Sequence, residues 1–166
     1  MKLAFKTATT EDVNDIAQLA DKIWKIHYPS IISMEQIEYM LKNMYSSKEL
    51  LKQMETGQVF TLVYLNNEPI GYVSISTKDN KNYFLHKFYI LVDEQKKGIG
   101  SELFDYILTQ IQDAETIELT VNRKNHKAIN FYFKNGFTIN EIADFDIGNG
   151  YFMNDFVMIK RLSKTT

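Results

Sequence analysis

A short loop with two lysines and two glycines stands between an apolar run and an amphipathic one. In "QKKGIG", Lys96 and Lys97 precede Gly98 and Gly100. The first N–H groups of a helix have no partner inside it, its dipole makes that end positive, and glycine lets a ligand approach the backbone. The loop is therefore suited to hold a phosphate, although the same residues also fit a solvated turn.

Two common phosphate-binding patterns do not fit this loop. In the P-loop pattern G-x-x-x-x-G-K-[ST], the second glycine precedes Lys and Ser or Thr, and neither Gly98 nor Gly100 does. The dinucleotide pattern G-x-G-x-x-G also fails, because Leu103 occupies the place of the third glycine. A phosphate held here belongs to another class of site.

A second stretch, "NHKAINFYFKNG", combines helix signals with a phenol. Asn125 is a good N-cap and Gly136 a good helix stop. Asn125 and Tyr132 are about two helical turns apart, which puts them on one face. A phenol with a pKa near ~10 is protonated at neutral pH and can donate a proton. The other interpretation is a capped helix whose tyrosine packs in the core.

Together these stretches resemble the GNAT superfamily of acyl-CoA-dependent N-acetyltransferases. The loop resembles the pyrophosphate-binding signature Q/R-x-x-G-x-G/A, and the helix resembles the pattern N-x-x-A-x-x-x-Y-x-x-x-G-F. The loop matches at Gln95, Gly98 and Gly100, and the helix at Asn125, Ala128, Tyr132, Gly136 and Phe137.

The resemblance implies acetyl-CoA as cosubstrate and Tyr132 as the general acid that protonates the departing thiolate. Main-chain groups around Ile90 and Val92 would hold the pantetheine arm, and an N–H near Ile90 would meet the thioester carbonyl. The residues implied in cosubstrate binding are Ile90, Leu91, Val92, Gln95, Lys96, Lys97, Gly98, Ile99, Gly100, Ser101, Asn122 and Asn125.

The acceptor is expected to be a primary amine. "ADFDIGNGYFMNDFVMIKRL" and "IWKIHYPSIISMEQIEYMLKNMYS" look like the bacterial branch that includes polyamine (spermidine/spermine) N-acetyltransferases. A polyamine or another small amine is thus the leading acceptor. The alternatives are a protein or peptide amine acetyltransferase and a non-catalytic CoA-binding sensor or interaction module.

As the group that takes the proton from the amine, "YFLHKFYI" offers His86 but no acid. His27 and Tyr28 are candidates for the substrate rim, and either histidine could instead be structural. Three acids near the last turn could attract a polyamine cation or simply be solvated, namely Glu141, Asp144 and Asp146.

The elements that must position these residues follow from hydrophobic periodicity, capping and turn residues. Trp24 falls on the apolar stripe of the first helix and is expected in the core or a pocket wall. Strands are expected over 3–9, 58–65, 70–77, 83–92, 116–122, 137–145 and 151–162, and helices over 9–28, 33–45, 46–57, 101–112 and 125–136.

This order predicts an α/β (α+β) fold. The strand–helix–strand step from Tyr83 to Asn122 implies one parallel pair with a right-handed crossover, while the hairpins are antiparallel. With the resemblance, the expectation is a GNAT-like mixed, mostly antiparallel twisted sheet with a parallel splayed pair and about five flanking helices, forming a single domain over 1–166.

Composition narrows the classes of partner. The net charge of −2 disfavours nucleic acid and membrane binding, and the chain has no cysteine for disulfides or thiolate metal sites. Its three histidines lack the spacing of paired ligands, so no metal is expected. No signal peptide is apparent, so a cytoplasmic location is expected. The last hairpin could form the edge of a homodimer.

Overall fold

The computed structural model describes residues 2–91 and 98–162, which form two compact units. The first unit is Met1–Ser76 with Lys87–Gln110, and the second is Thr77–His86 with Ile111–Thr166. The single-domain prediction is untested and stays a prediction. The helices are α1 (Val13–His27), α2 (Met34–Met44), α3 (Ser47–Glu55), α4 (Ile99–Gln110) and α5 (His126–Lys134).

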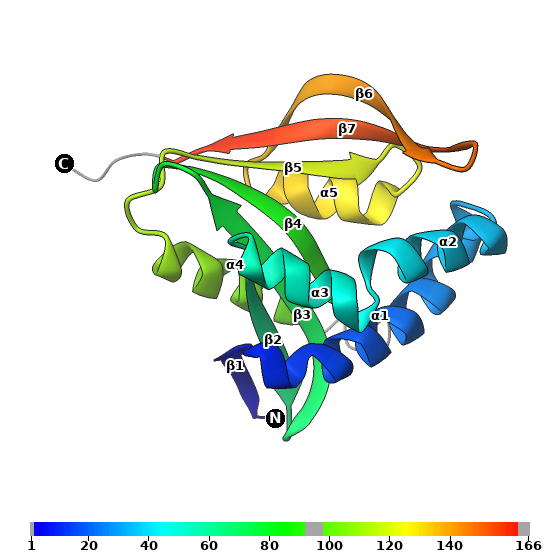
Figure 1. Cartoon of the computed structure of the whole chain (residues 1–166). Helices are drawn as coiled ribbons and strands as arrows, with labels where there is room; N and C mark the ends of the chain where they lie inside the picture. Colours follow the sequence, from blue (N-terminus) through cyan, green and yellow to red (C-terminus); the bar gives the residue numbers. More distant parts are fainter. Residues whose placement is uncertain (1, 92–97, 163–166) are drawn as a thin grey trace. The chain divides into compact units, whose positions relative to one another are not determined.

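Seven strands complete the predicted element order (Figure 1). Their hydrogen-bonded order is β1-β2-β3-β4-β5-β7-β6, and β4 passes from the second unit into the first. The mixed, mostly antiparallel sheet and the five helices are confirmed. The strands are β1 (Leu3–Thr7), β2 (Val59–Leu65), β3 (Glu68–Thr77), β4 (Asn82–Ile90), β5 (Thr116–Asn122), β6 (Thr138–Gly148) and β7 (Tyr151–Arg161).

Helix starts in the first unit follow from their capping residues. Thr9 forms a capping box with Asp12, and the short helical turn Thr10–Asp12 leads directly into α1. The hydroxyl of Ser33 accepts the N–H of Gln36 at 3.1 Å, and Ser46 caps α3 in the same way. Side-chain oxygens satisfy N–H groups that the helix leaves unpaired, so the predicted starts are confirmed to within a residue or two.

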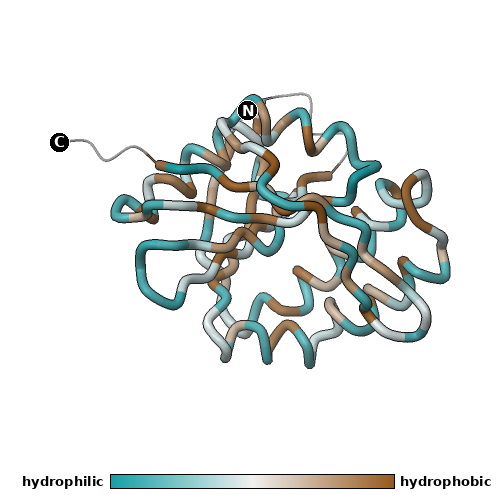
Figure 2. The backbone as a smooth tube through the Cα atoms, turned by 90° about the horizontal axis from the view of Figure 1, so that it is seen from above, coloured by the Kyte–Doolittle hydropathy of each residue, from teal (hydrophilic) through white to brown (hydrophobic). Residues whose placement is uncertain are grey.

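The core of the first unit lies between its helices and its antiparallel strands. Ile16, Ile37 and Leu50, from α1, α2 and α3, are fully buried. Brown and teal alternate along the helices in Figure 2, as expected when one helix face packs and the other is solvated.

The second unit contains the predicted parallel pair. Strand β4 pairs with β5 from Asn82↔Thr116 to Leu85↔Leu119, and both strands continue beyond the last pair. Strand β7 then pairs antiparallel with β5 and with β6. Helix α5 covers one face of this sheet, since Lys160 of β7 donates to the carbonyl of Asn135 at 2.8 Å.

Two hairpin strands are longer than predicted. Strand β3 begins at Glu68, and β6 runs through Asp146 to Gly148, because the turns need only two residues each. Asn66 and Asn67 form one turn with φ of 50° and 68°, and Asn149 and Gly150 form the other with 54° and 79°. Asparagine and glycine tolerate positive φ, which allows two-residue turns.

Candidate functional site

The start of α4 offers open space at its N-terminus. Gly98 has φ +75°, and among the described residues no atom beyond its chain neighbours lies within 4 Å of where a Cβ would stand. Ile99 is fully buried and anchors the helix. Gly100 and Ser101 are in the first turn. A ligand could approach these backbone groups closely. The predicted contacts at Val92, Gln95, Lys96 and Lys97 lie outside the described residues.

The end of β4 lies tightly against β3. A Cβ on Gly71 would collide with the carbonyl oxygen of Tyr89 and meet Cα of Ile90 at 3.2 Å, so only glycine fits. The N–H of Leu91 donates to the carbonyl of Ile70 at 2.8 Å. This amide is therefore already used, and a cosubstrate contact from Leu91 would have to use its carbonyl.

The side chains of Asn122 and Asn125, which precede α5, accept backbone hydrogen bonds. The side-chain oxygen of Asn125 accepts the N–H of Ala128 at 3.3 Å, which makes Asn125 the N-cap as predicted. The side-chain oxygen of Asn122 accepts the N–H of Lys124 at 2.9 Å. If either residue contacts acetyl-CoA, its amide NH₂ group is the available donor.

Tyr132 lies on α5 in a packed aromatic environment. Its ring meets those of Phe131 and Phe137 edge-on at centroid distances of 5.6 and 5.5 Å. The side chain is 8% exposed. The helix thus fixes the direction of the phenol, which a proton donor requires.

The three predicted substrate-rim residues fall in different units. In the first, the His27 ring lies 4.9 Å edge-on from Tyr28, whose hydroxyl is 3.2 Å from that of Tyr89. In the second, exposed His86 lies 4.8 Å from the Phe84 ring.

Tyr28 belongs to a largely buried aromatic cluster that the sequence did not reveal as a group. Its other members are Trp24, Tyr45, Tyr72 and Tyr89, with neighbouring centroids 4.3 to 6.3 Å apart. Burial raises the pKa of both Tyr45 and Tyr72. Within the described chain, Trp24 Nε1 and Tyr72 Oη are buried with no partner at normal hydrogen-bond distance. Trp24 is core, as predicted.

Lys87 on β4 lies beside this aromatic cluster. Its Nζ is 5.4 Å from the ring centroids of both Tyr45 and Phe60, and it donates to Gln58 Oε1 at 3.3 Å. Gln58 Oε1 also accepts the hydroxyl of Ser74 at 2.7 Å. Burial lowers the pKa of Lys87 to about 8.

Asp155 on β7 is the other buried charged residue that sequence reasoning missed. Its side chain is 2% exposed, and burial raises its pKa to about 6. A hydrogen bond from Thr120 and the charge of Arg123 act in the opposite direction, while Asp144 adds to the increase. For both Lys87 and Asp155, the sequence signal was a lone charge inside an apolar strand.

Arg123, just after β5, binds residues of β6 and β7 around Asp155. It donates to the carbonyls of Ala143 and Asp155 at 3.3 and 3.2 Å and pairs with Asp144 at 2.8 Å. Asp144 is therefore paired with arginine rather than simply solvated.

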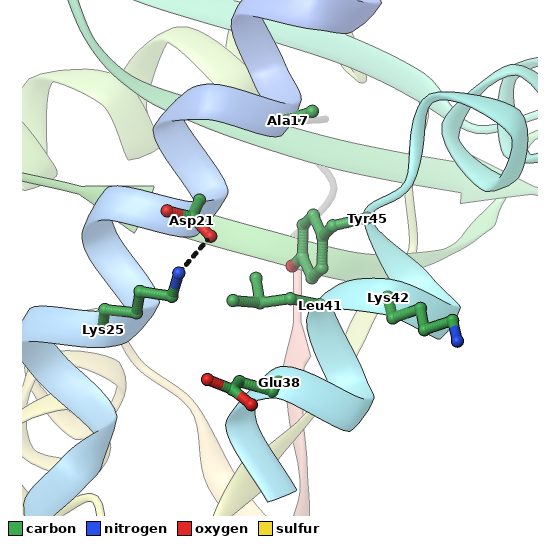
Figure 3. Close-up of a pocket in the computed structure, with 7 residues that line it drawn as sticks. All are labelled: Ala17, Asp21, Lys25, Glu38, Leu41, Lys42 and Tyr45. Carbon is green, nitrogen blue, oxygen red and sulfur yellow. Dashed lines mark ion pairs between the residues drawn. The ribbon is translucent and has the colours of Figure 1, made fainter. Parts of the chain in front are cut away.

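A separate pocket of about 330 Å³ lies between α1 and α2 in the first unit (Figure 3). Its polar wall carries an ion pair between Lys25 and Asp21 at 2.8 Å. Lys42 points away from it in Figure 3. None of the predicted site residues is among its lining residues, which are Ala17, Asp21, Lys25, Glu38, Leu41, Lys42 and Tyr45.

No group of three His, Cys, Asp or Glu side chains in 2–91 and 98–162 could hold a metal ion. No described helix is both long and apolar enough to cross a membrane.

The sequence matches the model of the acetyltransferase (GNAT) family over residues 19–137, which is more than half of the chain. The chain belongs to the GNAT acetyltransferase family. It is an N-acetyltransferase, and the acetyl donor of this family is acetyl-CoA.

Relatives of this chain match it over nearly their full length. A spermidine N(1)-acetyltransferase of Thermoplasma acidophilum is 26% identical over 168 residues, covering 97% of this chain and 98% of the relative. An uncharacterized N-acetyltransferase of Mycobacterium tuberculosis is 26% identical over 154 residues, covering 91% of this chain and 98% of the relative.

Solved GNAT structures share the fold. The PaiA N-acetyltransferase of T. acidophilum, solved in complex with coenzyme A, has a TM-score of 0.81 at 24% identity, covering 98% of this chain and 100% of that one. A GCN5-related N-acetyltransferase of Rhodopseudomonas palustris has a TM-score of 0.81 at 18% identity, covering 98% and 97%.

Proposed function

We propose that this GNAT enzyme transfers the acetyl group of acetyl-CoA to a primary amine of a small molecule, with polyamines as the leading acceptors. The observation that carries the proposal is the full-length match to a spermidine N(1)-acetyltransferase, together with family motifs at the starts of α4 and α5.

The N-terminus of α4 is the proposed seat of the acetyl-CoA pyrophosphate. Two features support this assignment: the space at Gly98 among the described residues, and the first-turn amides of a 12-residue helix, which a helix does not pair internally. In the same proposal, Gly100 and Ser101 contribute backbone amides, and Ile90 contributes main-chain contacts to the pantetheine arm. Bound acetyl-CoA supplies an activated acyl carbon and a thiol leaving group.

Tyr132 is the proposed general acid. Its phenol would hold a proton at Oη and donate it to the departing sulfur, while the aromatic packing on α5 keeps the ring in place. Asn125 contributes by starting the helix at a fixed residue.

His27, Tyr28 and His86 are the proposed contacts of the acceptor amine. Tyr28 is 8% exposed and shares a hydroxyl contact with Tyr89, so its phenol can orient a neighbouring polar group. Glu141 and Asp146, which are both exposed, would favour a cationic acceptor near the last turn.

The β6–β7 hairpin is the proposed edge of a homodimer. Strand β6 is the last strand in the sheet order, and an uncovered edge can pair with a second chain. Four large apolar side chains of the hairpin are exposed by 39 to 65%, namely Ile139, Ile142, Phe145 and Phe152.

The experiment that tests this function measures thiol release from acetyl-CoA with polyamines, free amino acids and short peptides as acceptors. We expect turnover with spermidine or spermine to exceed that with amino acids and peptides. Preferential turnover of peptides would favour the protein amine alternative. Tight acetyl-CoA binding by calorimetry without turnover of any amine would favour the sensor alternative.

A further inference from the structure

The helix that carries the proposed acid is short and ends soon after it. Helix α5 has 9 residues, and Tyr132 lies in its last turn. The last carbonyls of a helix have no partner inside it, and a helix of this length is held by packing more than by its own propensity. The direction of the Tyr132 phenol therefore depends on what holds the C-terminal end of α5.

The chain that follows α5 closes back on Tyr132 itself. The N–H of Phe137 donates to the carbonyl of Tyr132 at 3.0 Å, and the N–H of Gly136 donates to the carbonyl of Phe133 at 3.1 Å. With Gly136 at φ +90°, these are the two hydrogen bonds of a Schellman motif. The Phe137 ring packs edge-on against the Tyr132 ring and supplies the hydrophobic contact of the motif. A displacement of this turn would therefore move both the backbone and the ring of Tyr132.

Lys160 of β7 holds this turn from the sheet. Its Nζ donates at 2.8 Å to the carbonyl of Asn135, the residue between α5 and Gly136. The backbone of Lys160 is fixed opposite Ile117 in the β5–β7 ladder. A Cβ on Gly136 would occupy the place of the Lys160 ammonium, so the glycine leaves the space that the lysine needs. A cation at the C-terminal end of a helix is also favoured by the helix dipole.

From these contacts we propose that Lys160 is a positioning residue, which fixes the turn after α5 and thereby the direction in which Tyr132 presents its phenol. The inference rests on the proposed function, in which Tyr132 is the acid. Lys160, the turn and Tyr132 all belong to the second unit. A proton donor must point at the departing sulfur during the reaction, whereas substrate binding does not need the phenol. Loss of Lys160 should therefore lower kcat and leave KM nearly unchanged.

The test is a double-mutant cycle on kcat, with acetyl-CoA and a polyamine as substrates. Its four proteins are wild type, Lys160→Met, Tyr132→Phe and the variant with both changes. We expect Lys160→Met to lower kcat by about 10-fold or more, with KM for both substrates nearly unchanged. In the Tyr132→Phe background the phenol is already absent, so the same change should leave kcat nearly unaltered. A general loosening of the fold would instead lower kcat in both backgrounds.

The matched control is Lys134→Met, because Lys134 is an exposed lysine in the last turn of the same helix. This variant keeps the hydrogen bond from Lys160 and should keep the kcat of wild type. Amide hydrogen exchange locates the effect in the structure. In Lys160→Met the amides of Gly136 and Phe137 should exchange faster, while those of the β5–β7 ladder should keep their rates.

The outcomes separate this inference from the proposed function. If wild type acetylates no amine, the proposed function fails. If wild type is active and Tyr132→Phe is as active, the acid role and this inference fail together.

If Tyr132→Phe is impaired as expected, three results overturn the inference alone. These are an unchanged kcat in Lys160→Met, an equal loss of kcat in both backgrounds, or a rise in KM without a fall in kcat. Lys160→Gln, which also removes the ammonium, replaces Lys160→Met if that variant does not fold. Failure of both variants to fold would assign Lys160 to the stability of the whole fold and would also overturn the inference.

Discussion

Lys87 and Asp155 are charged residue types held inside the protein, and burial moves their pKa values in opposite directions. Desolvation always favours the neutral form, so it lowers the pKa of a lysine and raises that of an acid. Their charges therefore affect stability more than those of exposed ion pairs such as Lys25 with Asp21, which contribute little.

Lys87→Met should stabilise the protein at neutral pH. The pKa of Lys87 is about 8 in the folded chain and 10.5 unperturbed, so between these values the unfolded chain binds more protons and stability rises with pH. Below about pH 8 both states are protonated and the full cost of about 3 kcal/mol applies. Urea unfolding at pH 7 and pH 10 should show a rise in wild type that Lys87→Met lacks.

The exposed lysine Lys22 provides the control for that measurement. Lys22→Met should keep the rise with pH. A Lys87→Met protein whose stability increases between pH 7 and 10 as much as that of wild type would show that Lys87 is not the source.

Tyr132→Phe removes only the phenol oxygen and keeps the ring that packs on Phe131 and Phe137. Turnover should therefore fall by ~10²–10⁴-fold while acetyl-CoA affinity stays nearly the same. Steady-state kinetics and calorimetry measure the two quantities. Full activity in this variant would exclude Tyr132 as the acid.

At the scale of elements, the N-terminus of α4 should bind the pyrophosphate. Gly100→Glu places bulk and negative charge in the first turn and should abolish measurable acetyl-CoA binding by calorimetry. Gln110→Glu adds the same charge at the opposite end of this helix and should leave affinity unchanged. Equal affinities in Gly100→Glu and wild type would contradict the anion site.

Most elements could be predicted from the sequence because local residues determine them. Thr9, Ser33, Ser46 and Asn125 cap the helices where expected, since capping depends on residues within one turn. The ends of β3 and β6 were missed by a few residues, because strand length also depends on pairing with a partner.

The buried charged residues could not be predicted in the same way. The position of Asp155 opposite Asn122 follows from the β5–β7 register. Lys87 contacts Tyr45, just after α2, and Gln58 and Phe60, at the start of β2. These neighbours are distant in sequence, so a single sequence shows only an isolated charge in an apolar strand. The family motifs include Tyr132 and the residues before α4, but they contain neither Lys87 nor Asp155.

At the scale of the whole molecule, the free edge at β6 should support a homodimer. Ile142, exposed by 65%, is the most exposed of the apolar side chains on the β6–β7 hairpin. Ile142→Lys should shift the protein from dimer to monomer in light scattering, because a buried charge at an interface is costly. Ile26→Lys, at a residue of α1 exposed by 57%, should remain dimeric. A monomeric wild type would contradict this proposal.

The central claim is acetyl transfer from acetyl-CoA to a small primary amine. The most direct measurement is mass spectrometry of the products after incubation of the protein with acetyl-CoA and a mixture of polyamines, amino acids and peptides. We expect a polyamine that carries one acetyl group, formed in step with free CoA and nearly absent with Tyr132→Phe. Unmodified amines alongside intact acetyl-CoA would contradict the claim.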